Sequence, residues 1–252
     1  MSKYQAIVFD LDGTAISNFQ ASMPSQRLIE TVNKYRDKIH LIAATGRTIP
    51  DALPVIRALG LTNPCIVAGG TIIIDPATIE ILERTTLPPE SVQAIIQLLD
   101  GYPHFPTYIQ EERLGIGPKA AHGRIYDDAD IIFITDVGLE YVEPMARQLN
   151  DIPFITTSSV DSWSGIGQAL CITHVNATKE HAVATVLKGL DVSREASIGI
   201  GDGNNDLHLF RSVGLKIAMG NATAQLKAAA DLIAPSVDDD GLAEIIERYA
   251  TN

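Results

Sequence analysis

The sequence has little cysteine and lacks long apolar runs. Cys65 and Cys171 are the two cysteines among 252 residues, and each lies in an apolar stretch. We expect both to be buried small side chains rather than disulfide partners or catalytic thiols. The N-terminal stretch MSKYQAIVFD has no signal-peptide apolar segment, and no run approaches membrane-spanning length. The expectation is therefore a cytoplasmic protein with no membrane partner.

Positive charge is also scarce. Lysine and arginine number 19 against 31 aspartates and glutamates, which gives a formal net charge of -12. A net negative charge of this size repels nucleic acid and anionic lipid, so neither is a favoured partner. An anionic substrate would need local attraction from a metal ion, a lysine or backbone amides. The histidines show no metal-ligand spacing, so no zinc site is expected.

What the sequence does contain is typical of a globular protein. Hydrophobic residues make up 46% and charged residues 20% of a chain long enough for one large domain or two smaller ones. Short, β-branched runs at 6–9, 39–44 and 65–69 alternate with helical patterns at 24–37 and 48–60. Strand and helix patterns alternate again near the C-terminus, with strand patterns at 196–202 and 215–220. This order predicts an α/β fold with a doubly wound, Rossmann-like parallel sheet.

The middle of the chain has a different pattern. Between residues 82 and 172 prolines, aromatics and possible strand edges increase, with helical patterns at 89–101 and 139–150. Strands mixed with helices in this way predict an α+β unit inserted into the α/β fold. The expected domains are therefore a core from 1–81 and 173–252, and an inserted α+β domain over 82–172.

Polar clusters follow three of the expected strands, where ligands bind in an open parallel sheet. Each cluster alone is explained by a turn or a helix N-cap. Together, carboxylates gathered at one rim repel one another unless a cation lies among them. Oxygen ligands are those that Mg²⁺ prefers, so the pattern predicts a magnesium site. The three clusters are Asp10, Asp12, Gly13 and Thr14; Thr45, Gly46 and Arg47; and Asp202, Gly203, Asn204, Asn205 and Asp206.

Four features of the sequence resemble, in order, the signatures of the haloacid dehalogenase superfamily of phosphatases. They are FDLDGT, the Thr–Gly–Arg after the second strand, a lysine opening a later helix, and GDGNND. Lys179 matches the family spacing better than Lys188, which lies nearer the end of the same helix. The stretch IAMGNATAQLKAAADLIAPSVDDDGLAEII is similar to that of the Cof-type, subclass IIB, sugar-phosphate phosphatases, whose α+β cap is inserted between the second and third motifs.

The resemblance implies a Mg²⁺-dependent phosphatase acting on a small phosphorylated metabolite, with a sugar phosphate as the first candidate. Asp10 would be the nucleophile that forms an aspartyl-phosphate. Asp12 would be the general acid and then the general base, and its backbone carbonyl would also bind the metal. Asp10 and Asp202 would hold Mg²⁺ through their side chains, and Lys179 would supply a further positive charge. Gly13 suits the turn that brings Asp10 and Asp12 to one site.

Other residues receive supporting roles from the same resemblance. Thr45, the amide of Gly46 and Asn205 would donate hydrogen bonds to phosphoryl oxygens. Asp206 would orient a metal-bound water or Lys179 from outside the ligand set. Arg47 would either hold substrate or brace the cap through an ion pair, and the sequence favours neither. Gly69–Gly70–Thr71 replaces the Asn–Gly–Ala type of turn found in relatives, so substrate contacts there are left open.

The cap would close over the site, exclude water and select the leaving group. Its polar candidates have no distinctive spacing, and ordinary surface or core roles suit each of them better: Lys119, His122, Arg124 and Trp163. The nearer alternative is a sugar phosphomutase with a similar core, and two further functions are a receiver-like phospho-acceptor module and a catalytically silent binding protein. A receiver has no room for the insertion and no counterpart of Asp12, while a silent protein would have lost a catalytic residue. Oligomeric state is not indicated.

Overall fold

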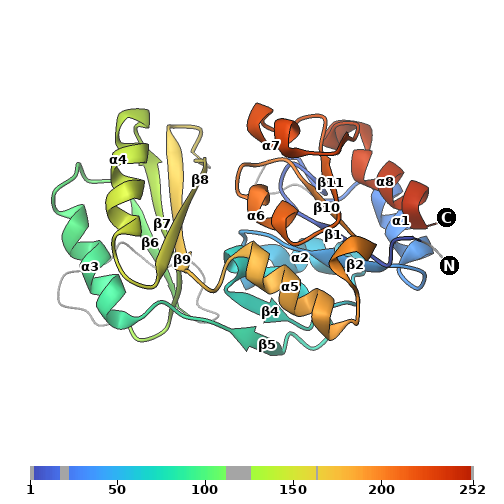
Figure 1. Ribbon diagram of the computed structural model, residues 1–252, viewed down its shortest axis with the longest axis horizontal. Coiled ribbons are helices and arrows are strands. Elements are labelled where there is room, and N and C mark those ends of the chain that lie inside the picture. Colours follow the sequence, from blue (N-terminus) through green and yellow to red (C-terminus); the bar gives the residue numbers. More distant parts are fainter. Residues whose placement is uncertain (1–2, 18–22, 112–125, 163, 251–252) are drawn as a thin grey trace. The chain divides into compact units, whose positions relative to one another are not determined.

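The chain separates into two compact units in the computed structural model, which describes residues 3–17, 23–111, 126–162 and 164–250 (Figure 1). The core unit comprises Met1–Glu83 and Lys179–Asn252, and the inserted unit comprises Arg84–Thr178. The weak cap candidates all lie outside the described residues: Lys119, His122, Arg124 and Trp163.

A five-stranded parallel sheet forms the centre of the core unit, with the order β12-β11-β10-β1-β2. Its strands are β1 (Ala6–Phe9), β2 (His40–Ala43), β10 (Ser197–Gly201), β11 (Leu215–Ala218) and β12 (Leu232–Ile233). Every residue of β1 is fully buried, as expected for a continuous apolar run between two paired strands. Phe9 pairs with Ile200 and with Ala43, so the carboxyl ends of these strands lie at one edge. The predicted doubly wound sheet is confirmed.

Two groups of helices surround this sheet. Helix α1 (Gln26–Tyr35) packs against α2 (Ile49–Leu59) and α8 (Gly241–Ala250). Helix α5 (Lys179–Gly189) packs against α6 (Asp206–Arg211), which in turn contacts α7 (Ala224–Ala229). The start of α1 is fixed by Ser25, whose Oγ accepts a hydrogen bond from the Leu28 amide at 3.0 Å.

The third expected strand takes a different place from that predicted. Strand β3 (Cys65–Val67) touches the parallel sheet through a single bridge between Ile66 and Ala44. Its ladder partner is β4 (Ile72–Ile74), which is antiparallel and continues to β5 (Ile81–Arg84). A short 3₁₀ turn, η1 (Ala68–Gly70), joins β3 to β4. Strands β4 and β5 are not predicted from the sequence, because such short strands give little periodic signal.

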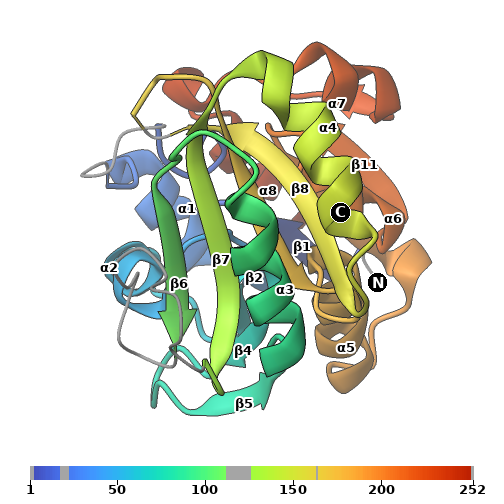
Figure 2. The ribbon, with the colours of Figure 1, turned by 90° about the vertical axis from the view of Figure 1, so that its left-hand side faces the viewer.

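The inserted unit is an antiparallel sheet with two helices. The strand order is β6-β7-β9-β8, and α3 and α4 both lie on one face of this sheet (Figure 2). The elements are α3 (Pro89–Leu99), β6 (Thr107–Glu111), β7 (Ala129–Val137), α4 (Leu139–Asn150), β8 (Ile155–Asp161) and β9 (Gln168–His174). The predicted α+β insertion is therefore confirmed as a fold class. Because β9 continues to His174, the unit ends later in the chain than residue 172.

The cysteines lie in different environments. Cys65 is buried, and burial raises the pKa of its thiol to about 12, whereas Cys171 is half-buried. Neither forms a disulfide, as expected, but the expectation that both are buried is wrong for Cys171. Within the part of the chain that the structure describes, no helix combines the length and apolar character required to span a membrane.

Candidate functional site

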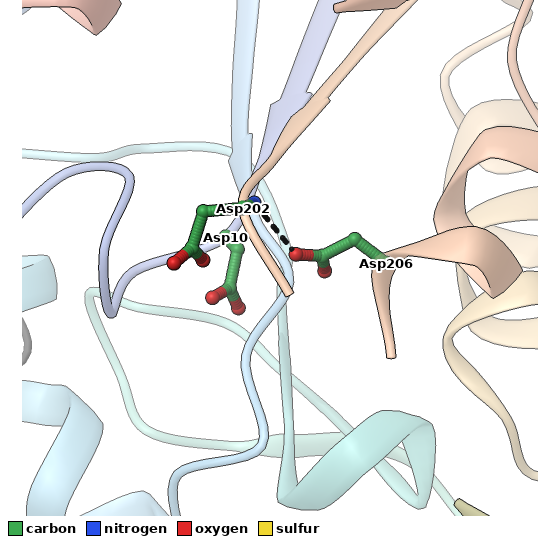
Figure 3. Close-up of side chains that lie close together, drawn as sticks. All are labelled: Asp10, Asp202 and Asp206. Atoms are coloured by element: carbon green, nitrogen blue, oxygen red, sulfur yellow. Dashed lines mark hydrogen bonds between the residues drawn. The ribbon is translucent and has the colours of Figure 1, made fainter. Parts of the chain in front are cut away.

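Three carboxylates meet at the carboxyl edge of the parallel sheet. Asp10 directly follows β1, Asp202 directly follows β10, and Asp206 begins α6. One oxygen from each lies within 4.8 Å of the others (Figure 3), and Asp10 and Asp206 are buried. The parallel register explains this convergence, because β1 and β10 end side by side.

Lys179 is the cation of this cluster. It is the first residue of α5, and its Nζ donates hydrogen bonds to Oδ1 of Asp10 and to Oδ1 of Asp206, each at 2.7 Å. Burial alone would lower the pKa of Lys179, but the charges of the two aspartates raise it above its ordinary value. Lys179 is therefore positively charged at neutral pH. Lys188, the alternative considered from sequence, is exposed in the last turn of α5.

Asp206 organises the loop that carries Asp202. Its Oδ2 accepts a hydrogen bond from the Asp202 amide at 3.0 Å (Figure 3) and another from the Gly203 amide at 3.1 Å. Its Oδ1 accepts a hydrogen bond from Lys179. Because both of its oxygens already accept hydrogen bonds, Asp206 is better suited to holding the loop and Lys179 than to binding a ligand directly. The carboxylates of Asp10 and Asp202 are then the ones best placed to hold a metal ion.

The charge balance of the cluster fits a bound cation. Burial raises the pKa of Asp10 well above its ordinary value, and repulsion from Asp206, Asp202 and Asp12 adds to this effect. Lys179 acts in the opposite direction but is a single positive charge among several acids. A divalent cation with a preference for oxygen ligands would relieve this repulsion. The residues present therefore fit a metal ion.

Asp12 lies outside the three-carboxylate cluster and is paired with Arg47. The guanidinium donates from Nε to Asp12 Oδ2 at 2.8 Å and from Nη2 to Asp12 Oδ1 at 2.6 Å. This hydrogen-bonded pair raises the pKa of Arg47. Arg47 also donates to the carbonyl of Asp51 at 3.2 Å. This bidentate pair is not predicted from the sequence, which suggests substrate or the cap as partners for Arg47.

Thr45 and Gly46 follow β2 at the same edge. Thr45 is buried, and its Oγ1 accepts a hydrogen bond from the Arg47 amide at 3.1 Å. A Cβ added at Gly46 would have no heavy atom within 4 Å apart from its own chain neighbours, so space is open beside this backbone. Asn205 immediately precedes α6, with its side-chain oxygen turned towards Gly203.

Two contributors to this region were missed in the sequence analysis. Asn221 donates from Nδ2 to the Gly13 carbonyl at 2.8 Å, and the same nitrogen lies 3.5 Å from Asp202 Oδ2. The Thr223 amide donates to the Asp202 carbonyl at 2.9 Å. Both residues follow β11, another strand of the same sheet, so inspecting every strand end would have found them.

The architecture and the family signatures agree with comparisons to known proteins. The profile of the haloacid dehalogenase-like hydrolase family matches residues 7–123 and 126–246, and the chain belongs to this family. The family resemblance drawn from the four sequence signatures is therefore confirmed. The chain is a phosphoric monoester hydrolase, and phosphatases of this family use a metal ion.

Relatives and solved structures cover nearly the whole chain. The 5-amino-6-(5-phospho-D-ribitylamino)uracil phosphatase YcsE of Bacillus subtilis is 26% identical over 96% of this chain and 94% of its own. A phosphoglycolate phosphatase of Archaeoglobus fulgidus is 27% identical over 98% and 97%. The solved structure of the subclass IIB sugar phosphatase BT4131 has a TM-score of 0.79 at 20% identity, covering 98% of this chain and 100% of that one. This similarity shows that the two proteins share the same fold.

Gly13 is a position where only glycine fits the site. Its φ is +70°, and an added Cβ would lie 2.0 Å from Asp202 Oδ2. Gly13→Ala is therefore expected to displace the Asp202 carboxylate and lower kcat/KM by about 10²-fold, since small displacements of positioning groups have effects of this size. Steady-state phosphate release provides the measurement.

Gly189→Ala is the matched control for this substitution. Gly189 ends α5, where an added Cβ meets no heavy atom within 4 Å, so activity should remain at the wild-type level. Wild-type activity in Gly13→Ala would show that the close approach of Gly13 to Asp202 has no functional importance.

Proposed function

We propose that this phosphatase is Mg²⁺-dependent and hydrolyses a small phosphomonoester through an aspartyl-phosphate formed on Asp10. The observation that carries the proposal is the buried contact of Asp10 with Lys179, next to Asp202, at the sheet edge. A sugar phosphate is the favoured substrate class. Support for this choice comes from YcsE, whose named substrate carries a phosphorylated ribityl chain, and from the fold shared with a sugar phosphatase.

The metal would be held by a small set of oxygen atoms. We assign the carboxylates of Asp10 and Asp202 and the backbone carbonyl of Asp12 as its protein ligands. When bound, Mg²⁺ supplies positive charge that offsets the charge of the phosphoryl group. Asp206 keeps Asp202 and Lys179 in place through its hydrogen bonds.

In the first step the Asp10 carboxylate attacks phosphorus, and the bond from phosphorus to the leaving oxygen breaks. Asp12 donates a proton to that oxygen, so that the product leaves as a neutral alcohol. Lys179 holds the Asp10 side chain in position through the 2.7 Å bond to Oδ1. We assign hydrogen bonds to the phosphoryl oxygens to Thr45, the Gly46 amide and Asn205.

In the second step Asp12 takes a proton from a water molecule, and the water oxygen attacks phosphorus. The bond between phosphorus and Asp10 breaks, which returns the carboxylate and releases inorganic phosphate. Arg47 contacts both oxygens of the Asp12 carboxylate, and we assign it the role of positioning the Asp12 side chain.

Phosphate release from a panel of phosphomonoesters tests the proposal. Release should require Mg²⁺, stop in EDTA and return when Mg²⁺ is added in excess, with sugar phosphates among the best substrates. Activity undiminished by EDTA would contradict the metal requirement. An isomeric sugar phosphate as product, in place of free phosphate, would contradict hydrolysis and identify a mutase.

A further inference from the structure

The loop after β11 has contacts with the acidic site that the proposed mechanism does not use. This loop, residues 219–223 with the sequence MGNAT, contributes the bonds from Asn221 to the Gly13 carbonyl and towards Asp202 Oδ2. We infer that Asn221 is a positioning residue that holds the Asp202 carboxylate in its metal-binding orientation. The inference rests on the proposed function, because it assumes that Asp202 is a metal ligand.

The orientation of the Asn221 amide is fixed by a contact at its other end. Its Oδ1 accepts a hydrogen bond from the Val237 amide at 2.9 Å, at the start of the 3₁₀ turn η3 (Val237–Asp239). A flipped amide would place N–H groups against the Val237 N–H and an oxygen against the Gly13 carbonyl. The contact with Val237 therefore directs the Nδ2 group of Asn221 towards Gly13 and Asp202.

Asn221 and Gly13 together confine the Asp202 side chain. Gly13 lies so close to this carboxylate that an added Cβ would overlap it, while Asn221 Nδ2 lies 3.5 Å from Oδ2. Because Asn221 also holds the Gly13 carbonyl at 2.8 Å, it fixes the position of Gly13 relative to Asp202. Without the amide, repulsion from Asp10 would favour other orientations of the Asp202 carboxylate.

The same loop also holds the backbone of Asp202. The Thr223 amide donates to the Asp202 carbonyl at 2.9 Å, and Thr223 Oγ1 donates to Asn204 Oδ1 at 2.7 Å. The loop thus contacts Asp202 at both its carbonyl and its carboxylate. Asn221 itself is an exposed residue, so its side-chain bonds contribute little to the stability of the fold. Their main effect is on the geometry of the site.

The test is direct metal binding by Asn221→Ala, with Mn²⁺ alone as the probe and electron paramagnetic resonance to count free Mn²⁺. The dissociation constant should rise by about 10- to 100-fold, as is typical when an outer partner of a metal ligand is lost. The KM for Mg²⁺ in phosphate release should rise similarly, while kcat at saturating Mg²⁺ changes less. The circular dichroism spectrum should match that of wild type.

Two further variants distinguish positioning of Asp202 by Asn221 from a general loosening of the chain around η3. Ser236→Ala removes the bond from Ser236 Oγ to Asp239 Oδ2 in the same region and should bind Mn²⁺ with wild-type affinity. Val237→Pro removes the N–H that donates to Asn221 Oδ1, at the first position of η3, where proline is accepted. It should weaken Mn²⁺ binding, though less than Asn221→Ala does.

The possible failures are distinguishable. Wild-type Mn²⁺ affinity in both Asn221→Ala and Val237→Pro would overturn the inference and leave the proposed function intact. An equal loss of affinity in Ser236→Ala would also overturn it, because the effect would then be general to the segment. If the wild-type protein binds no Mn²⁺, the proposed metal site is wrong. The inference about Asn221 is then wrong as well.

Discussion

Asp10→Asn is expected to lower kcat/KM for phosphate release by about 10⁴-fold or more, a loss typical of removing a catalytic nucleophile. The amide cannot attack phosphorus, so no covalent intermediate forms. The fold should be retained, because the change removes one negative charge from a crowded acidic cluster and leaves the 2.7 Å pair of Lys179 with Asp206. Steady-state phosphate release with Mg²⁺ measures the activity, and thermal unfolding checks the fold.

Asp12→Asn is a second variant that tests the assignment of Asp10 as the nucleophile. With an aryl phosphate, whose leaving group needs no proton, the first step should proceed while the water-dependent second step is slowed. Mass spectrometry of the quenched variant should then detect one phosphoryl group on the peptide containing Asp10. Activity in Asp10→Asn within tenfold of wild type, or a phosphoryl group found on another residue, would contradict the assignment of Asp10 as nucleophile.

Lys179→Met is expected to lower both activity and stability. Methionine has a similar length but no charge, so Asp10 and Asp206 would lose the cation that both contact at 2.7 Å. Removing one partner of a buried ion pair typically costs about 3–5 kcal/mol in the free energy of unfolding. Urea unfolding at pH 8 in EDTA measures this loss. Lys188→Met, an exposed change near the end of the same helix, should leave the unfolding free energy close to that of wild type.

The stability of Lys179→Met should also depend on pH with a defined sign. Burial raises the pKa of Asp10 in the folded protein, and Lys179 opposes this increase, so the variant should raise that pKa further. Above the ordinary aspartate pKa of about 3.9, the folded state then holds a proton that the unfolded state has released. The unfolding free energy should therefore fall as pH rises through this window. A variant equally stable at pH 5 and pH 8 would contradict this electrostatic role of Lys179.

The sequence predicted the parallel core well because its strands are continuous apolar runs followed by polar residues. The positions of Asp10, Asp202 and Asp206 follow from the rule that parallel strands share a carboxyl edge. The 35-residue separation between Arg47 and Asp12 gives no periodic signal, so their pairing depends on the folded geometry. Asn221 was missed for a different reason, since the strand-end rule was applied to three strands and not to β11.

The smaller features of the fold were harder to predict from local pattern. Strands β4 and β5 are short, and β5 is partly exposed, so neither shows the alternation of a longer strand. Strand β3 was recognised as a strand, but its antiparallel partner β4 was not. Pairing direction depends on the path of the chain through η1, where Gly69 and Gly70 both have positive φ. Local apolar character does not encode that path.

The position of β1 in the sheet has a consequence for how the protein is made. Ala6 lies between His40 and Ser197 in the ladder, so β1 is synthesised well before β10, which is one of its two neighbours. The inserted unit, in contrast, is a continuous segment with its own apolar cluster, which includes Ile95, Ile132 and Met145. On the ribosome, this later segment can therefore become compact before β1 is paired on both sides. The acidic cluster contains Asp202 as well as Asp10, so a growing chain cannot complete this cluster until β10 and the loop after it have been added.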